Sequence, residues 1–303
     1  MTRILRSSAR AQPESDLPGQ IGNPDKELPS QLQDTNVKFI PPSKLTQLPD
    51  LNPEETTLLR KKQHRLRLST TITRRTATKY GPHISNALSA TFIFAQHEAG
   101  TAVCVDPQGW ILTCAHCFGE SEEEWQSNRR KWLLGYTGLA VQVECRVWDC
   151  TRDLALAKVS AVEGLTAPGF PSVVLPLSPP TASDYARTPV ICIGQPGADD
   201  LESSKPKSTD YDLVEISEGR LRGLVPGANP QDNSEIGTLK HDAWTYWGHS
   251  GAPLVSRETG VLLGLHSSWD DETAMRHGVP VVAIQEFLAI HLPQKDRVDG
   301  TSS

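Results

Sequence analysis

The chain has 303 residues and a net charge of −6, enough for two compact units or for one domain of about 200 residues with a tail. Hydrophobic residues make up only 37%, so part of the chain is expected to contribute little to a core. No run of about 18 apolar residues occurs, and the first residues lack the apolar core of a secretory signal. These features exclude a membrane-spanning protein and predict an intracellular one, cytoplasmic or nuclear.

Residues 1–80 are expected to form a largely disordered tail. They contain eight prolines, and their 14 Lys and Arg exceed their 8 Asp and Glu by six, which leaves −12 on the rest of the chain. Such a basic tail is expected to contact anionic partners. Arg3, Arg6 and Arg10, with no acidic residue among the first 13, also suit a mitochondrial transit peptide, so that location stays open.

Within this tail, Asn52-Pro53-Glu54-Glu55 predicts the start of a short helix over 53–68. Asn is a good N-cap, Pro is favoured in the first turn, and acids are stabilised by the positive end of the helix dipole. The second half of the helix, 60–67, is a basic cluster. It is either a nuclear address or phosphate contact or, as is commoner, a solvated helix face.

From Ile84 onward the sequence changes to short strands separated by Gly, Pro and Asp. Apolar residues alternate with polar ones in these segments, for example at Val141, Val143, Cys145 and Val147. Many short strands at this spacing indicate an all-β barrel or sandwich.

A proline-rich stretch divides this β body, because strands cannot continue through it. A terminal amphipathic helix is indicated by Ile284, Phe287, Leu288 and His291, which fall at i, i+3, i+4 and i+7. The expected divisions are a body at 81–292, with a first half at about 84–163, a linker at about 164–189, a second half at about 190–282 and the helix at about 283–292, followed by a disordered tail at 293–303.

The segment Gly248-His249-Ser250-Gly251 is the strongest candidate for chemistry. Small residues around a serine allow a tight turn that presents the hydroxyl, while neighbouring backbone N–H groups can converge on a substrate oxygen. A G-x-S-x-G segment also occurs in α/β-hydrolases, whose chain order is Ser, acid, His. Here the best His and Asp, His116 and Asp153, both precede the serine, which excludes that order.

With this order, the body resembles the trypsin/HtrA group of serine proteases. Five segments match that group in sequence order: 100–103 with 110–116, 149–156, 191–197, 241–243 and 264–267. The resemblance covers roughly 84–292. It implies an all-β, chymotrypsin-like fold of two six-stranded antiparallel β-barrels, and it implies a serine endopeptidase that acts on protein or peptide substrates without a cofactor or metal.

The resemblance also implies a role for each residue of the site. Ser250 is the nucleophile that forms an acyl-enzyme, His116 is its base, and Asp153 orients the imidazole. The N–H groups of Gly248 and Ser250 form the oxyanion hole. His249 stands where the family usually has Asp or Asn, but this change removes no catalytic atom.

The side chain expected before the scissile bond is Glu or Gln. Trp244 lies six residues before Ser250, where trypsin-like pockets for Lys or Arg have Asp. Thr245 and His266 resemble the specificity pair of glutamyl endopeptidases and picornaviral proteases, and both can donate to a carboxylate or carboxamide oxygen. Ser267, on the same strand, is also expected to bind substrate. The alternative is that Thr245 completes the turn and His266 is a core histidine.

Three further alternatives stay open. The barrels can serve as a catalytically inactive scaffold or interaction module, or the basic tail can bind nucleic acid, although the acidic body argues against the latter. Cys114 and Cys117 form a CxxC, which is weak evidence for a zinc or redox site. The six cysteines are expected to be reduced thiols. The sequence predicts no particular oligomeric state.

Overall fold

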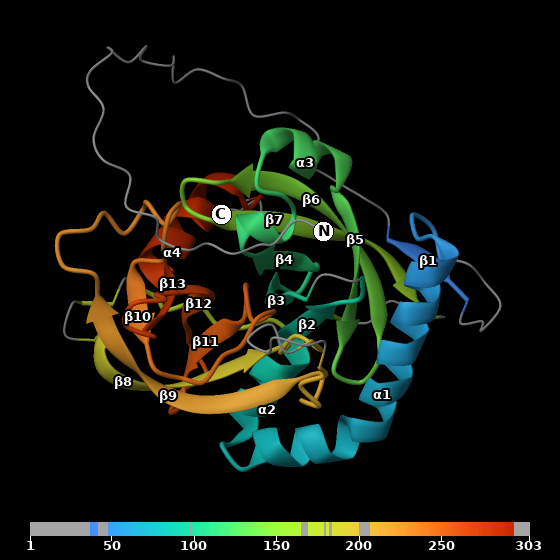
Figure 1. The fold of residues 1–303 in the computed structure, drawn as a ribbon, viewed down its shortest axis with the longest axis horizontal. Helices are drawn as coiled ribbons and strands as arrows, with labels where there is room; N and C mark the ends of the chain where they lie inside the picture. Colours follow the sequence, from blue (N-terminus) through green and yellow to red (C-terminus); the bar gives the residue numbers. More distant parts are fainter. Residues whose placement is uncertain are drawn as a thin grey trace, which may run out of the picture.

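Two closed six-stranded β-barrels form the body of the protein, as the computed structural model shows (Figure 1). The structure describes residues 37–41, 48–96, 99–164, 169–178, 180–181, 184–199 and 207–293. In Figure 1 the first barrel is green and the second runs from yellow to red. The prediction of an all-β fold with two six-stranded antiparallel barrels and a C-terminal helix is confirmed.

The first barrel follows the strand order β7-β4-β3-β2-β5-β6 and closes by pairing of β6 with β7. A short strand, β1 (Lys38–Ile40), adds to β7 in parallel from outside the barrel. Val141, Val143 and Cys145 are fully buried, as their alternation predicted. The strands are β2 (Thr91–Phe94), β3 (Thr101–Asp106), β4 (Trp110–Thr113), β5 (Arg130–Gly135), β6 (Ala140–Asp149) and β7 (Leu154–Glu163).

The second barrel follows the order β10-β13-β12-β11-β8-β9 and closes by pairing of β9 with β10. Its first strand begins at Ala186, four residues before the predicted start, because Pro189 is accommodated where the register with β9 shifts. The strands are β8 (Ala186–Gly194), β9 (Glu215–Leu224), β10 (Leu239–His241), β11 (Pro253–Ser256), β12 (Leu262–Trp269) and β13 (Arg276–Pro280). The terminal helix α4 (Val281–His291) buries Ile284, Phe287 and Leu288.

Helix α1 (Pro53–Thr78) begins as predicted but runs ten residues beyond the predicted end at 68. Asn52 and Glu55 form a capping box. The continuation is rich in threonine, which lowers helix propensity, but these hydroxyls donate to carbonyls one turn earlier, for example Thr70 Oγ1 to Leu66 O at 2.7 Å. Packing against the barrels supplies the remaining stability. The disorder predicted for 1–36, 42–47 and 294–303 falls on residues outside the described ones.

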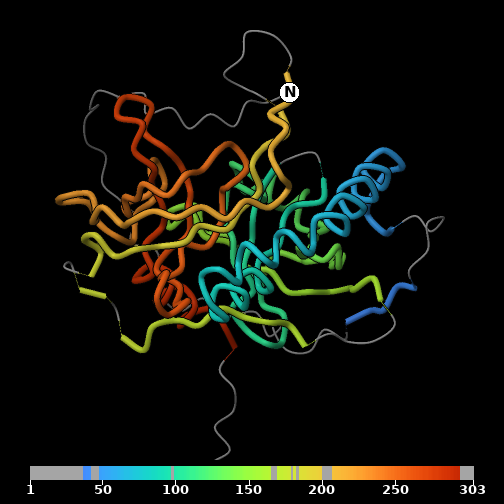
Figure 2. Tube along the Cα trace, turned by 90° about the horizontal axis from the view of Figure 1, so that it is seen from below, coloured from blue at the N-terminus to red at the C-terminus, as the bar shows by residue number. Residues whose placement is uncertain are grey.

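A second helix, α2 (Pro82–Ala90), occupies the segment from which strands were expected, so the first barrel begins at Thr91 rather than near Ile84. It contacts β2 and β3 of the first barrel, while His83 Nε2 lies 2.8 Å from Arg257 O of the second. Figure 2 shows α1 and α2 (blue to cyan) running along the outside of the barrels. Of the helices described, none is long and apolar enough to cross a membrane.

Some residues of the basic cluster at 60–67 bind α1 to the first barrel through hydrogen bonds and an ion pair. Lys62 Nζ donates to the carbonyls of Phe94 and Gln96 at 2.9 and 2.7 Å, and Arg60 pairs with Glu163. Other cluster members, such as Lys61 and Arg67, are exposed. The predicted solvated face is therefore found for only part of the cluster, and the nuclear address or phosphate contact stays a prediction.

Buried Gln63 offers a test of this docking, since its Nε2 donates to Gly138 O and to Glu163 Oε2, each at 2.8 Å. Gln63→Ala leaves buried acceptors short of a donor and is expected to lower the free energy of unfolding by about 1–3 kcal/mol. Lys61→Ala, on the exposed face, is the control and should change it by less than about 0.5 kcal/mol. Urea denaturation of both variants measures the difference, and equal effects would contradict the docking.

Candidate active site

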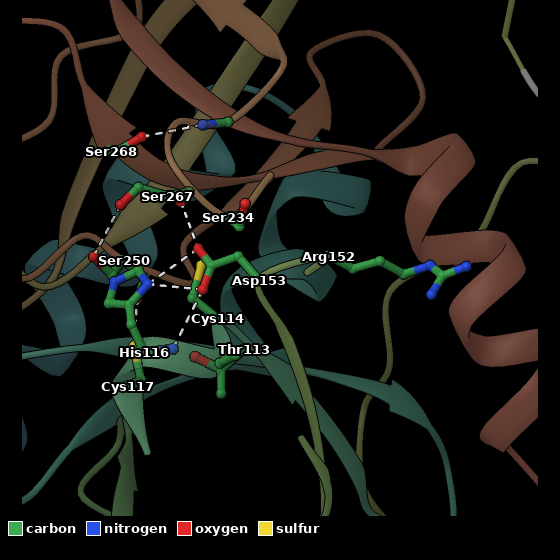
Figure 3. A network of polar contacts seen from close by, with 12 residues as sticks. Thr113, Cys114, His116, Cys117, Arg152, Asp153, Ser234, Ser250, Ser267 and Ser268 are labelled. Atoms are coloured by element: carbon green, nitrogen blue, oxygen red, sulfur yellow. Dashed lines mark hydrogen bonds and ion pairs between the residues drawn. The ribbon is translucent and has the colours of Figure 1, made fainter. Parts of the chain in front are cut away.

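Three candidate residues come from three separate segments that meet where the barrels abut (Figure 3). His116 lies on a short 3₁₀ turn, η2 (Ala115–Cys117), directly after β4. Asp153 immediately precedes β7, also in the first barrel. Ser250 lies in the turn before β11 of the second barrel. The structure brings together these three residues, which the sequence separates by 37 and 97 positions.

His116 and Asp153 form a buried hydrogen-bonded pair. His116 Nδ1 lies 2.9 Å from Asp153 Oδ1 and 3.0 Å from Oδ2, and the backbone N–H of His116 donates to Oδ1 at 3.2 Å. Asp153 is fully buried and His116 is 8% exposed. An ionised carboxylate only accepts, so the imidazole proton lies on Nδ1 and Nε2 is left as an acceptor.

Ser267 connects this pair to Ser250 (Figure 3). Its hydroxyl donates to Asp153 Oδ2 at 2.6 Å, and its backbone carbonyl accepts the Ser250 hydroxyl at 3.2 Å. Among the described residues no hydrogen bond joins Ser250 Oγ to His116. Sequence reasoning expected Ser267 to bind substrate, but its hydroxyl is used by Asp153, so any substrate contact falls to its backbone.

Arg152, which sequence reasoning missed, fixes the loop that carries Asp153. Its guanidinium bonds Asp149 Oδ2 at 2.9 Å within the loop, and Glu286 on α4 and Gln231 in the second barrel at 2.8 Å each. Asp153 itself has φ of 52°, a left-handed conformation that costs a non-glycine residue about 1–3 kcal/mol. The only sequence signal for this role is that Arg152 adjoins the candidate aspartate.

The turn around Ser250 needs its two glycines. Gly248 and Gly251 have φ of 97° and 83°. A Cβ on Gly248 would meet Gln195 O at 2.6 Å, and one on Gly251 would meet Thr101 O at 2.1 Å. Alanine at either position would therefore be both strained and obstructed.

Two backbone N–H groups of this turn have no acceptor in the described part of the chain. The N–H of His249 donates to Tyr246 O at 3.1 Å, and that of Gly251 donates to His266 O at 2.8 Å. The N–H groups of Gly248 and Ser250, on either side of His249, make no such bond to any described residue. They are the pair expected to form an oxyanion hole, and they are free to bind a substrate oxygen.

The predicted specificity residues, Thr245 and His266, are each 5% exposed. His266 belongs to a pair that the sequence did not reveal, because His241 Nε2 lies 3.0 Å from His266 Nδ1. The fully buried His241 has no hydrogen-bond partner for its own Nδ1. A buried N–H without an acceptor is costlier than a bare lone pair, so Nδ1 of His241 is the unprotonated atom. His241 then donates from Nε2, and His266 carries its proton on Nε2.

Three histidines near this turn are held neutral. Burial, with added repulsion from Arg276, lowers the pKa of His241 to about 3 and that of His266 well below its ordinary value. Burial also lowers the pKa of His249 to about 4, although its ring bonds the backbone of Tyr246. At neutral pH these imidazoles act as uncharged donors and acceptors.

Cys114, His116 and Asp153 place their donor atoms within 4.8 Å of one another, a spacing that suits a metal ion. However, His116 Nδ1 is bound to Asp153, and the Cys114 thiol donates to His266 O at 3.4 Å. Cys117 donates to Ser250 O, so the CxxC thiols connect η2 to the second barrel. All six cysteines are free thiols, and burial raises the pKa of Cys104, Cys145 and Cys192 to about 12 each.

Among the solved structures that resemble this fold are two proteases. One is the crystal structure of the serine endoprotease from Yersinia pestis, with a TM-score of 0.49, 18% identity, and coverage of 70% of this chain and 66% of that one. The other is the Rv3671c protease in its inactive form, with a TM-score of 0.47, 15% identity, and coverage of 69% and 92%. This chain thus spans slightly less than two thirds of the Yersinia chain.

No curated protein matches the chain closely enough in sequence to count as a relative. The family model described as a trypsin-like peptidase domain matches residues 100–265, which is more than half of the chain and includes strands of both barrels. The chain therefore belongs to the family of trypsin-like peptidase domains.

Proposed function

We propose that the protein is a serine endopeptidase in which His116, Asp153 and Ser250 form the catalytic triad. The observation that carries this proposal is the continuous chain of hydrogen bonds from His116 through Asp153 and Ser267 to the Ser250 hydroxyl. The two unused N–H groups beside Ser250 support it further, because an acyl-transfer site needs donors for the developing oxyanion.

In the first half of the proposed reaction, the Ser250 hydroxyl turns from Ser267 O to His116 Nε2. Its oxygen attacks the carbonyl carbon of the scissile peptide while Nε2 takes the proton. Asp153 stabilises the imidazolium that results, and the N–H groups of Gly248 and Ser250 bind the oxyanion. Each such donor is typically worth about 10²–10³ in rate.

The second half returns the enzyme to its starting state. The imidazolium of His116 gives its proton to the leaving amine as the C–N bond breaks, which leaves an acyl ester on Ser250. Water then attacks the ester while His116 accepts a proton from it. The bond between the acyl carbon and Ser250 Oγ breaks, His116 returns the proton to Ser250 Oγ, and the acid product leaves. Every proton is returned, so no cofactor is needed.

A catalytically inactive scaffold is the second candidate, and one observation favours it. Ser250 Oγ donates to Ser267 O rather than to His116. Catalytic hydrogen bonds are often misaligned without substrate and tighten when it binds, so the endopeptidase remains the better supported function.

For the substrate, we propose a protein or peptide with Glu or Gln before the scissile bond. Thr245 and His266 supply a hydroxyl and an imidazole, and the neutral His266 with its proton on Nε2 is a donor to a side-chain oxygen. Trp244 lies in a cluster with Tyr211 and Tyr246, which leaves no carboxylate at this position for a Lys or Arg side chain.

Labelling with a fluorophosphonate probe tests the nucleophile. The full-length protein is expected to become covalently labelled, and Ser250→Ala should abolish both labelling and peptide cleavage, with at least about a 10³-fold loss of rate. Ser127→Ala is the matched control and should label like the wild type, because Ser127 is an exposed residue of helix α3 (Glu122–Ser127) in the first barrel. A folded wild-type protein that takes up no probe would support the scaffold instead.

Cleavage of a peptide library by the full-length protein tests the pocket. Cuts should fall mainly after Glu or Gln, and Thr245→Val, which keeps the shape but removes the hydroxyl, should lower kcat/KM for these peptides about 10-fold while probe labelling persists. Dominant cleavage after Arg or Leu would refute the proposed pocket without refuting the nucleophile.

The neutral histidines predict acid sensitivity. Below pH 6.5 the unfolded chain binds protons at His241 and His249 that the folded protein, with pKa values of about 3 and 4, does not. The stability these groups contribute is complete above pH 6.5 and is lost as pH falls, by up to about 1.4 kcal/mol per pH unit for each histidine.

Urea denaturation at a series of pH values between 6.5 and 4.5 measures this slope. His249→Gln should reduce the slope by up to about one proton, whereas His64→Gln, on the exposed face of α1, should not. A stability that does not change over this range would mean that the histidines are protonated in the folded protein.

A further inference from the structure

Arg276, the first residue of β13, carries a positive charge that nothing in the described part of the chain neutralises. With the described residues its guanidinium forms no ion pair, and its Nε is buried without a hydrogen-bond partner among them. The side chain is partly buried. The Nε atom has lost contact with water without gaining a partner, which is costly for a polar group, so its retention requires an explanation.

Strand register places the Arg276 side chain on the inner face of the second barrel. Arg276 pairs with His241 on β10 and with Trp269 on β12. Residues directly opposite one another in an antiparallel sheet point to the same face. His241 is fully buried with its ring against His266, so the Arg276 side chain leaves β13 on the same, inward side.

The charge of Arg276 reaches the residues that surround Ser250. Burial is the main cause that lowers the pKa of His266, which adjoins Ser267, and of His249, which adjoins Ser250, and the charge of Arg276 adds a smaller contribution to both. Burial and then the charge of Arg276 also lower the pKa of His241 on the opposite strand. These electrostatic effects and the strand register agree. Both place the guanidinium near the residues that would contact a substrate side chain bound beside Ser250.

Two of the residues nearest to Arg276 across the sheet, His241 and Trp269, are each followed in the sequence by an aspartate. Both of these carboxylates accept hydrogen bonds from other residues. Asp242, next to His241, accepts from Arg222 Nε at 2.8 Å and from the Arg220 N–H at 2.6 Å. Asp270, next to Trp269, accepts from Thr273 Oγ1 at 2.7 Å. Neither of these carboxylates therefore neutralises Arg276, whose guanidinium is left able to bind an anion from a ligand.

We infer that Arg276 binds the carboxylate of an acidic side chain, Glu or Asp, at the residue before the scissile bond. The inference rests on the proposed endopeptidase function and narrows its substrate class from Glu or Gln to acidic residues. In this arrangement Arg276 supplies the charge of the pocket, while Thr245 and the neutral His266 supply hydrogen bonds.

Charge decides between Glu and its uncharged isostere Gln. Both side chains offer an oxygen to Thr245 and His266, but only the carboxylate also neutralises the guanidinium. A hydrogen bond to a charged group is worth enough to give Glu an advantage of about 10- to 100-fold in kcat/KM.

The guanidinium keeps its charge across the working range of an enzyme, so this advantage should not change between pH 6 and 9. A pocket charged by a protonated histidine would instead lose its preference for Glu as pH rises through that range. Among the described residues, the charge of Arg276 acts on Cys192 on β8, His241 on β10, His249 in the turn and His266 on β12, while His277 is its neighbour on β13.

The test compares two peptides that differ only in Glu or Gln before the scissile bond, cleaved by the full-length protein. The wild type is expected to show a Glu/Gln ratio of kcat/KM of about 10 to 100. Arg276→Met should bring the ratio near one by loss of the Glu peptide alone, whereas Arg276→Lys, which keeps the charge, should retain a preference for Glu. A merely structural role would not separate Met from Lys in this way.

Arg257→Met is the matched control, because Arg257 is ion-paired with Glu218 and its side chain is about half exposed. It should keep the wild-type ratio. Fluorophosphonate labelling of each variant reports on the triad separately. A labelled wild type whose ratio is near one, or whose ratio survives Arg276→Met, overturns the inference and leaves the endopeptidase standing. A wild type that neither labels nor cleaves overturns both.

Discussion

The Asp153 carboxylate is the group on which the geometry of the candidate site depends. It is fully buried, so its charge must be balanced by donors, and these come from both barrels. His116 supplies a ring N–H and a backbone N–H from the first barrel, and Ser267 supplies a hydroxyl from the second. The need to satisfy one buried charge therefore also fixes how the two barrels meet, and through Ser267 it sets the position of the Ser250 hydroxyl.

The backbone that brings the candidate catalytic groups together is strained at two places, and contacts with neighbouring residues offset the cost of that strain. Asp153 is in a left-handed conformation. Gly248 has a positive φ and lies so close to its neighbours that a side chain there would collide with them. Arg152 offsets the strain at Asp153, since its guanidinium bonds the loop itself, α4 and the second barrel. The groups proposed for catalysis are thus presented by turns of fixed shape, which lowers the reorganisation needed when a substrate arrives.

Sequence patterns predicted the features that depend on neighbouring residues in the chain. They failed for features that depend on contacts between residues distant in the sequence. The alternation at Val141 and Val143 and the order of His116, Asp153 and Ser250 pointed to the barrels and to the candidate site. The length of α1 was underestimated because its threonine-rich end is a poor helix by propensity and is stabilised by packing.

The pairing of His241 with His266 and the place of Arg276 depend on register across β10, β12 and β13. Register between strands that are distant in sequence cannot be counted from a single sequence, because each one-residue slip reverses the face of every side chain. Residues 81–303 carry a net charge of −12, so the long-range electrostatic field of the body does not attract acidic peptides. If Arg276 binds a substrate carboxylate, selection for that substrate must therefore arise at short range, where one unpaired guanidinium outweighs the more distant and screened charges of the surface.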